Sequence, residues 1–444
     1  MNDSNNKKGW RRENTSNSLS EVFATINFPS RGSKWQKMFA FMGPGMMVAV
    51  GYMDPGNWAT DIAGGAKFGY ALLSVIFISN IFAIFLQHLA LKLGIATGRD
   101  LAQACRDSYS KPVSFVLWIL CELAIAACDL AEVLGSALAL NLLFKIPLFI
   151  GVCITILDVF LILYLNNKGF RVLEVIISVL IFTILLCFGY ELFLSKPDIL
   201  PMAKGLIPTL ELFKNKEMLY IGIGILGATV MPHNLYLHSS IVQTRKIENT
   251  LQAKKSAVKY ATIDSTVALL FAFFINAAIL ILAASAFHKT GYQDVADINR
   301  AYELLNPLLG AKFAALFFGI ALLASGQNAT LTGTLAGQIV MEGFLNIKLK
   351  PWLRRLITRV IAIIPALIVT YIYGENGVGD LLVLSQVILS LQLSFAVIPL
   401  VVFTSDKLKM GEFVNAFWLK YWVILIAFII LSLNIYLLVQ TLFF

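Results

Sequence analysis

Long apolar segments recur along the whole chain and are separated by short polar connections. Eleven segments reach or approach the roughly 20 residues that an α-helix needs to cross the hydrocarbon core of a bilayer. They are residues 42–67, 70–95, 112–141, 146–165, 172–194, 218–240, 260–287, 312–342, 354–373, 380–403 and 417–443. Regular alternation of apolar and polar residues, the mark of membrane-spanning strands, is absent. The pattern therefore predicts an all-α integral membrane protein with about eleven transmembrane helices, each satisfying its own backbone hydrogen bonds in lipid.

Composition and charge agree with this class. Of the 444 residues, 58% are hydrophobic and 14% are charged, whereas soluble domains carry about a quarter charged residues. Basic residues gather in the first 37 residues and in alternate connections, which are residues 99–111, 168–171, 245–259, 348–355 and 407–409. Because basic connections stay inside the cell, we expect a cytoplasmic N-terminus and an external C-terminus. This bias also explains the net charge of +9, so no nucleic-acid partner is expected.

Two apolar segments are interrupted near their middle by residues that are rare in membrane helices. The first contains DPGN at 54–57, and the sixth contains MPHN at 231–234. The first interruption comes about fifteen residues, or ~22 Å, after the apolar run begins near Phe39, which is near the bilayer midplane. Helices broken at matching positions of two halves are typical of inverted-repeat transporters, in which they form the substrate site.

The same spacing divides the chain into two halves of opposite topology, because five helices begin with each broken one. The predicted organisation is a polar cytoplasmic tail (1–37), a first five-helix repeat (38–195), an external loop (196–216), a second repeat (217–404) and a last helix (405–444). The two breaks then enter the membrane from opposite sides and meet at similar depth. One site, shared by both repeats, is predicted.

The residue types at the breaks favour a metal ion. A proline removes a backbone donor, so carbonyl oxygens are left to bind a cation. Asp54 adds a negative charge, Asn57 a neutral oxygen and Met231 a thioether, which favours Mn²⁺ or Fe²⁺ over calcium or magnesium. A lone proline is usually a kink and a lone methionine usually packing. A carboxylate at the middle of a bilayer, however, is costly enough to indicate function.

A second set of polar residues lies in the third and ninth helices. Glu122, Asp129 and Glu132 are spaced by seven and three residues and therefore share one helical face. Arg354 and Arg355, at the inner end of the ninth helix, are candidate partners. Carboxylates near arginines can pass protons, and they can equally form a static ion-pair network that joins two helices.

Histidines and cysteines carry weaker signals. His233 directly follows the proline of the sixth helix and would suit proton exchange with Asp54, whereas His238, one turn later, fits packing and proton exchange equally well. The five cysteines lack the pair spacing of metal sites and are expected to be small buried residues. ATP-binding and common hydrolase motifs are absent, so an enzyme is the poorest interpretation.

Several of these segments resemble the natural resistance-associated macrophage protein family of proton-coupled divalent metal importers. They are GYMDPGNWATDIAGG, DLAEVLG, GATVMPHNLYLHSS, GTLAGQ and SQVILS, and the similarity extends from about Met38 to the C-terminus. The resemblance implies a LeuT-like fold of two inverted five-helix repeats, with the metal ion held between the broken first and sixth helices.

The resemblance also implies roles for individual residues. Asp54, Asn57 and Met231 would be side-chain ligands, Gly51 and Ala228 would offer backbone carbonyls, and Gln386 would approach the ion when the outer side closes. Proton-path and salt-bridge positions would be His233, Asp129, Glu132, Arg354 and Arg355, with Glu122 further towards the cytoplasm. Two departures from the family pattern, Cys128 in place of a threonine and Gly51 in place of an alanine, leave the side-chain ligands intact.

The expected function is therefore import of Mn²⁺ or Fe²⁺, and of ions like Cd²⁺ and Co²⁺, coupled to protons by alternating access. A monomer in the inner membrane of a bacterium, without a prosthetic group, is expected. A metal sensor or channel-like protein is one alternative. A sodium-coupled amino-acid carrier is another, although Met231 has no evident role in holding a substrate carboxylate or sodium.

Overall fold

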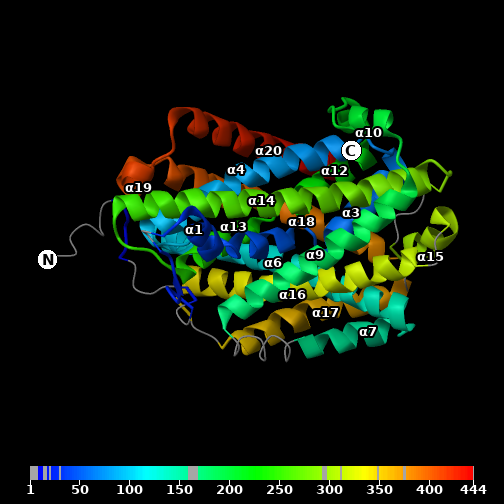
Figure 1. The fold of residues 1–444 in the computed structure, drawn as a ribbon, viewed down its shortest axis with the longest axis horizontal. Coiled ribbons are helices and arrows are strands. Elements are labelled where there is room, and N and C mark those ends of the chain that lie inside the picture. Colours follow the sequence, from blue (N-terminus) through cyan, green and yellow to red (C-terminus); the bar gives the residue numbers. More distant parts are fainter. Residues whose placement is uncertain are drawn as a thin grey trace.

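The computed structural model of the protein describes residues 9–13, 18–19, 22–29, 32–158, 169–292, 298–310, 313–347, 350–373 and 377–443. Helices dominate the described residues and run side by side along the longest dimension of the molecule (Figure 1). The first described residues and the end of the last helix lie towards opposite ends of this bundle. We call the end that carries the N-terminal residues the N-terminal face, and the other end the opposite face.

Eight helices in the described residues are long and apolar enough to span a membrane. They are α4 (Leu73–Thr97), α6 (Lys111–Phe144), α9 (Phe170–Ser195), α12 with α13 and η3 (Lys216–Thr244), α14 with η4 (Leu251–His288), α16 (Ala314–Leu345), α18 (Val378–Thr404) and α20 (Phe417–Phe443). Shorter apolar helices are α7 (Leu148–Ile154), followed by η2 (Thr155–Leu157), and α17 (Pro351–Tyr373). The predicted fourth span, 146–165, continues into residues outside the described ranges.

The first and sixth helices are broken where the sequence predicts. The first consists of α2 (Pro44–Gly51) and α3 (Pro55–Phe68), and the sixth of α12 (Lys216–Thr229) and α13 (Pro232–Ile241). Each second half begins with a proline, which is tolerated there because the first residues of a helix need no N–H partner. The residue before each proline is extended, with φ −70° and ψ 166° at Asp54 and φ −62° and ψ 123° at Met231, as steric contact with the proline ring requires.

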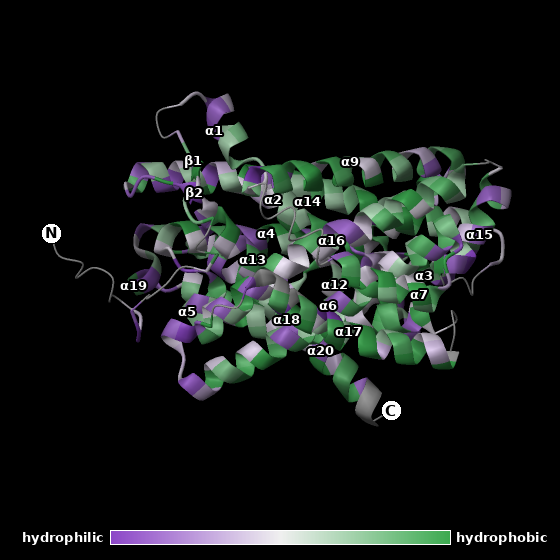
Figure 2. Ribbon diagram, turned by 90° about the horizontal axis from the view of Figure 1, so that it is seen from below, coloured by the Kyte–Doolittle hydropathy of each residue, from purple (hydrophilic) through white to green (hydrophobic). Residues whose placement is uncertain are grey.

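Short elements close the two ends of the bundle. The N-terminal face carries α1 (Lys34–Phe41), α5 (Leu101–Ser108), η3 (Val242–Thr244), α19 (Lys407–Met410) and η5 (Gly411–Phe413); the opposite face carries α10 (Ile199–Gly205), α11 (Glu211–Lys214) and α15 (Ile298–Leu309). Hydrophobic residues cover most of the helix lengths, whereas hydrophilic residues gather around β1, β2, α5 and α19 (Figure 2). This distribution suits helices that cross a bilayer and ends that meet water.

The described part of the predicted polar tail is folded against the N-terminal face. Strand β1 (Ile26–Asn27) pairs in parallel with β2 (Arg245–Lys246), which directly follows the sixth helix. The backbone N–H of Leu19 donates to the Glu342 carboxylate at 3.1 Å, and the guanidinium of Arg99 lies 4.6 Å from the centre of the Trp10 ring. The tail therefore contacts several helices at this end.

Aromatic packing holds the second half of the first helix in the middle of the bundle. The buried Trp58 of α3 lies between Phe188 of α9 and Phe318 of α16, with ring centroids 4.7 and 5.2 Å apart. Because a bulky indole fits such a place in few orientations, the neighbouring residues Asp54 and Asn57 are held in position as well.

Candidate metal site at two broken helices

The backbone at both breaks leaves a carbonyl oxygen without its helical partner. In a continuous helix the carbonyl of each residue accepts from the N–H four residues later. For Gly51 that residue is Pro55, and for Ala228 it is Pro232, neither of which has an N–H. Gly51 and Ala228 are both buried. The two carbonyls expected to face a cation are therefore the ones that the prolines release.

Asp54 and Asn57 form a cap at the start of α3 and point polar oxygens into the break. Asp54 Oδ1 accepts from the backbone N–H of Asn57 at 2.8 Å. The Asn57 side-chain amide donates to the Tyr52 carbonyl at 2.8 Å, and its Oδ1 has no hydrogen-bond partner although the residue is only 1% exposed. A buried oxygen without a partner is rare in proteins, so this atom is available to a ligand.

Met231 and Gln386 complete the group of predicted ligands. Met231, at the break of the sixth helix, packs in a buried cluster with Ala124, Cys128 and Leu389. Gln386 of α18 lies directly against Gly56, where any side chain would overlap its amide. Its Nε2 donates to Ser385 Oγ at 2.9 Å, and its Oε1 has no hydrogen-bond partner. Helices from both halves of the chain thus bring oxygen and sulfur atoms to one buried region.

The described residues contain no group of three His, Cys, Asp or Glu side chains that could hold a metal ion. A cation at the breaks would therefore need the Asn57 amide, the Met231 thioether or backbone carbonyls in addition to Asp54. Asp54, Met231 and Gln386 are each 0% exposed. The site is accordingly closed to water on both sides in this conformation.

Comparison with known proteins agrees with this arrangement. A family model described as natural resistance-associated macrophage protein-like matches residues 45–440. The chain belongs to the natural resistance-associated macrophage protein (Nramp) family. The divalent metal cation transporter MntH of Listeria monocytogenes serotype 4a is 64% identical over 436 residues, which cover 98% of this chain and 97% of the relative. The protein of the same name from Nostoc sp. is 62% identical over 425 residues and covers 96% of each chain.

Solved structures support the fold of this Nramp protein. The manganese transporter of Eremococcus coleocola superposes with a TM-score of 0.87 at 43% identity and covers 94% of this chain and 90% of that one. Mhp1 in its inward-facing conformation superposes with a TM-score of 0.56 at 15% identity, over 97% and 94% of the two chains, and shows the fold alone. The predicted all-α, LeuT-like membrane fold is confirmed, while the count of eleven helices and the boundaries of the repeats stay predictions.

The predicted acidic face of the third helix of the Nramp protein is buried beside an arginine that the sequence reasoning missed. Glu132 is 0% exposed and its Oε2 lies 3.8 Å from Nη1 of Arg359, which is itself 0% exposed. Arg359 Nη2 also contacts Asp158 Oδ2 at 3.2 Å and Thr330 Oγ1 at 2.9 Å. An arginine within the apolar run LITRVIA was the available signal, because a charge in a membrane helix is costly.

Of the two arginines predicted to pair with the acidic face, the structure shows the contacts of one. Arg354 Nη2 lies 2.9 Å from both carboxylate oxygens of Glu122, whose side chain keeps 23% of its surface exposed. The side chain of Arg355 lies outside what the structure describes. Asp129 is buried on the same face, and His233 is buried at the start of α13. The predicted carboxylates, His233 and Arg354 therefore extend from the break towards the N-terminal face.

His233 and His238 have different surroundings. His233 is 3% exposed and its Nδ1 has no hydrogen-bond partner. His238 Nδ1 lies 2.9 Å from Gln87 Oε1, and Gln87 Nε2 donates to the Tyr52 hydroxyl at 2.8 Å. Tyr52 immediately follows α2, so His238 is linked to the first break through Gln87, a connection that sequence spacing did not indicate.

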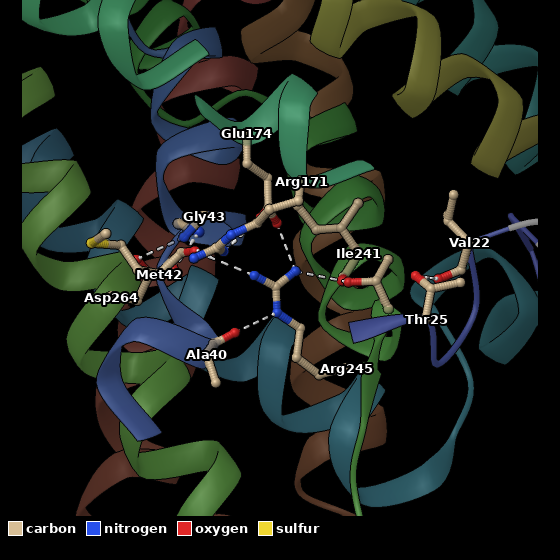
Figure 3. Close-up of polar contacts among 12 residues, drawn as sticks. Val22, Thr25, Ala40, Met42, Gly43, Arg171, Glu174, Ile241, Arg245 and Asp264 are labelled. Atoms are coloured by element: carbon tan, nitrogen blue, oxygen red, sulfur yellow. Dashed lines mark hydrogen bonds and ion pairs between the residues drawn. The ribbon is translucent and has the colours of Figure 1, made fainter. Parts of the chain in front are cut away.

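A group of ion pairs and hydrogen bonds, which we call the latch, joins three elements to the start of the first helix at the N-terminal face (Figure 3). It consists of Arg171 and Glu174 of α9, Arg245 of β2 and Asp264 of α14. Arg245 Nη1 lies 2.6 Å from Glu174 Oε1, and Arg171 Nη1 lies 2.8 Å from Glu174 Oε2. Both Glu174 and Arg245 are buried.

The latch fixes the start of the first broken helix. Asp264 Oδ2 accepts from the Gly45 N–H at 2.7 Å, and Arg245 Nε donates to the Ala40 carbonyl at 3.1 Å. Gly43 has a φ of 141°, a conformation that side chains rarely adopt, and the Glu174 carboxylate lies directly against it. Hydropathy and spacing do not indicate this group, because its members are far apart along the chain.

Proposed function

We propose that this protein imports divalent transition metal ions, Mn²⁺ or Fe²⁺ and also ions like Cd²⁺ and Co²⁺, together with protons, by alternating access. The observation that carries the proposal is the buried, unpartnered Asn57 Oδ1 beside Asp54, at a break that faces the Met231 break. The names of the Listeria and Eremococcus relatives, a divalent metal cation transporter and a manganese transporter, support the substrate class. A transporter is therefore proposed rather than an enzyme.

The ion would be held by Asp54, Asn57 and Met231 together with the released carbonyls of Gly51 and Ala228. Oxygen ligands bind all divalent ions, whereas a thioether adds affinity for softer transition metals and little for calcium. Gln386 would contribute its unpartnered Oε1 when the external side is closed. The substrate ion and the proton are the only small molecules that this function requires.

Protons would leave the break along Asp54, His233, Glu132 and Asp129 and continue to Glu122, with Arg354 and Arg359 beside the carboxylates. A divalent ion favours the ionised form of a carboxylate that it binds, so binding at Asp54 would release a proton to its neighbours. The acidic face starts at the metal site and ends near the N-terminal face, which gives proton and metal partly separate routes.

Alternating access requires that the two faces open in turn. We propose that the latch closes the N-terminal face, that this face is cytoplasmic and that the C-terminus is external, in agreement with the distribution of basic connections. The protein would act as a monomer in the bacterial inner membrane. Opening would break the contacts of Arg245 and Glu174, which hold the end of α1 against β2 and α9.

Uptake of Mn²⁺ into proteoliposomes that contain a pH-sensitive dye tests this function. We expect uptake with internal acidification in the native protein, and calcium competition that becomes appreciable only in Met231→Ala. Met218→Ala is the matched control, since Met218 is a buried methionine near the far end of α12. The proposal fails if Asp54→Asn retains metal-stimulated proton uptake, or if the native protein takes up no metal.

The same vesicles separate the alternatives. A channel would pass the ion without saturation and without a fixed proton ratio, and a sensor would bind the ion but not transport it. Uptake of labelled amino acids driven by sodium would instead favour an amino-acid carrier. Each of these results would contradict proton-coupled metal import directly.

A further inference from the structure

A cysteine thiol lies beside the predicted metal ligands. Cys128 is on α6, one turn before Glu132, and it is 3% exposed and not in a disulfide. Its Sγ is 3.8 Å from Asp54 Oδ2 and 3.8 Å from Glu132 Oε1. The oxygen of Asp54 that is not used to cap α3 therefore faces a sulfur atom.

The surroundings of Cys128 also belong to the break of the sixth helix. Cys128 and Met231 share one buried cluster with Ala124 and Leu389, so two sulfur-containing side chains pack together next to Asp54. The unpartnered Oδ1 of Asn57, three residues after Asp54 and almost fully buried, independently indicates that a ligand belongs here. A thiol, a thioether and a carboxylate thus meet from three helices, and the unpartnered amide oxygen lies one helical turn after the carboxylate.

The spacing of these atoms suits a shared metal ion. A tetrahedral ion with a sulfur ligand at ~2.3 Å and a carboxylate oxygen at ~2.1 Å holds the two ligand atoms ~3.6 Å apart. The observed separation of Cys128 Sγ and Asp54 Oδ2, 3.8 Å, is close to this value. Little movement is needed for both atoms to reach one ion.

We propose that Cys128 is an additional sulfur ligand of the transported ion and shifts the preference of the site towards thiophilic divalent ions such as Cd²⁺. This inference rests on the proposed function, because it assumes that the breaks bind a divalent metal. Sulfur ligands bind soft ions more strongly than Mn²⁺, which prefers oxygen. Coordination replaces the S–H bond by a sulfur–metal bond and releases one proton, for which Glu132 is a neighbouring acceptor.

A purely packing role is the competing explanation, and the choice of variants distinguishes the two. Cys128→Ser keeps the size and hydrogen bonding of the side chain and removes only the sulfur. Cys121→Ser is the matched control, because Cys121 is buried two turns earlier on the same helix. All proteins would carry Cys153→Ser, since Cys153 is exposed and could bind cadmium by itself.

The first measurement is ultraviolet absorption of the purified protein during titration with Cd²⁺, which reports charge transfer from a thiolate to the metal. We expect the band in the Cys153→Ser protein and in the Cys121→Ser control, and its absence in Cys128→Ser. The second measurement is the dissociation constant of Mn²⁺ divided by that of Cd²⁺. This ratio should fall about tenfold or more in Cys128→Ser, because Cd²⁺ binds more weakly while Mn²⁺ binding changes little.

The outcomes separate this inference from the proposed function. Mn²⁺ binding without a thiolate band in the Cys153→Ser protein would overturn the role of Cys128 and leave metal transport standing, and this result needs no folded Cys128 variant. A cadmium–thiolate band in Cys128→Ser, or an unchanged ratio of the Mn²⁺ and Cd²⁺ dissociation constants in this variant, would overturn the role of Cys128 as well. Failure of the protein with Cys128 to bind Mn²⁺ and Cd²⁺ would overturn both proposals.

Discussion

Replacing Glu174 by glutamine removes the negative charge that pairs with Arg171 and Arg245 in the latch, and it keeps the volume of the side chain. The side chains of Arg245 and Glu174 are 0% and 2% exposed, and their charged atoms lie 2.6 Å apart. Removing one partner of a buried ion pair costs about 3–5 kcal/mol, because the remaining charge stays buried without compensation. Glutamine can still accept one hydrogen bond from Arg245, so we take the lower value, ~3 kcal/mol.

The lost free energy destabilises the closed state, in which Arg245 and Glu174 are paired. Since each 1.4 kcal/mol changes an equilibrium tenfold, ~3 kcal/mol increases the population with an open N-terminal face ~150-fold. Hydrogen–deuterium exchange of the peptides that cover α1 and α2 measures this directly, because the backbone N–H groups of this segment are protected only while it stays docked. We expect faster exchange in Glu174→Gln by about two orders of magnitude.

The matched control is an ion pair of similar length at the surface. Lys289 Nζ lies 2.9 Å from Asp198 Oδ2, and the two side chains are 60% and 51% exposed. Exposed pairs contribute little because water and salt screen them, so Lys289→Gln should leave the exchange of α1 and α2 unchanged. Acceleration of less than about fivefold in Glu174→Gln, or equal acceleration in both variants, would refute the role of the latch.

Three further predictions concern stability. Arg359→Met should lower the thermal unfolding midpoint strongly, by the equivalent of about 3–5 kcal/mol, because it leaves the fully buried Glu132 carboxylate and the 13% exposed Asp158 carboxylate beside an apolar side chain. An equal effect of Arg354→Met, whose partner Glu122 is 23% exposed, would contradict this. Gly227→Ala should destabilise the protein, since a methyl group there would meet the backbone of α18, whereas Gly189→Ala meets nothing within 4 Å and should not lower stability. An unfolding midpoint of Gly227→Ala that is not below that of Gly189→Ala would contradict this. Burial raises the pKa of Asp100, which caps α5, to about 6. Ionisation of this carboxylate therefore destabilises the folded state as the pH rises from about 4 through 6. Asp100→Asn should gain stability relative to the native protein between pH 4.5 and pH 7, and a stability difference between the two proteins that does not change with pH would contradict the raised pKa.

The sequence alone predicted the membrane class, the two breaks and most of the candidate ligands. These features are local: a run of about twenty apolar residues is accommodated by a bilayer, and a proline removes its N–H whatever surrounds it. Asp54, Asn57 and Met231 stand beside the prolines, so their place at the breaks follows from chain connectivity. The spacing of Glu122, Asp129 and Glu132 likewise fixed their common helical face.

Only the tertiary structure decided which distant residues meet. The latch gathers residues 171, 174, 245 and 264 around the start of the first helix, and Arg359 reaches the carboxylates of Glu132 and Asp158. Cys128 was noticed in the sequence only as a departure from a family pattern, and its position beside Asp54 and Met231 became visible in the fold. Hydropathy and helical periodicity describe how one segment relates to the membrane and to itself, whereas contacts between helices depend on how they pack, and spacing along the chain does not encode that.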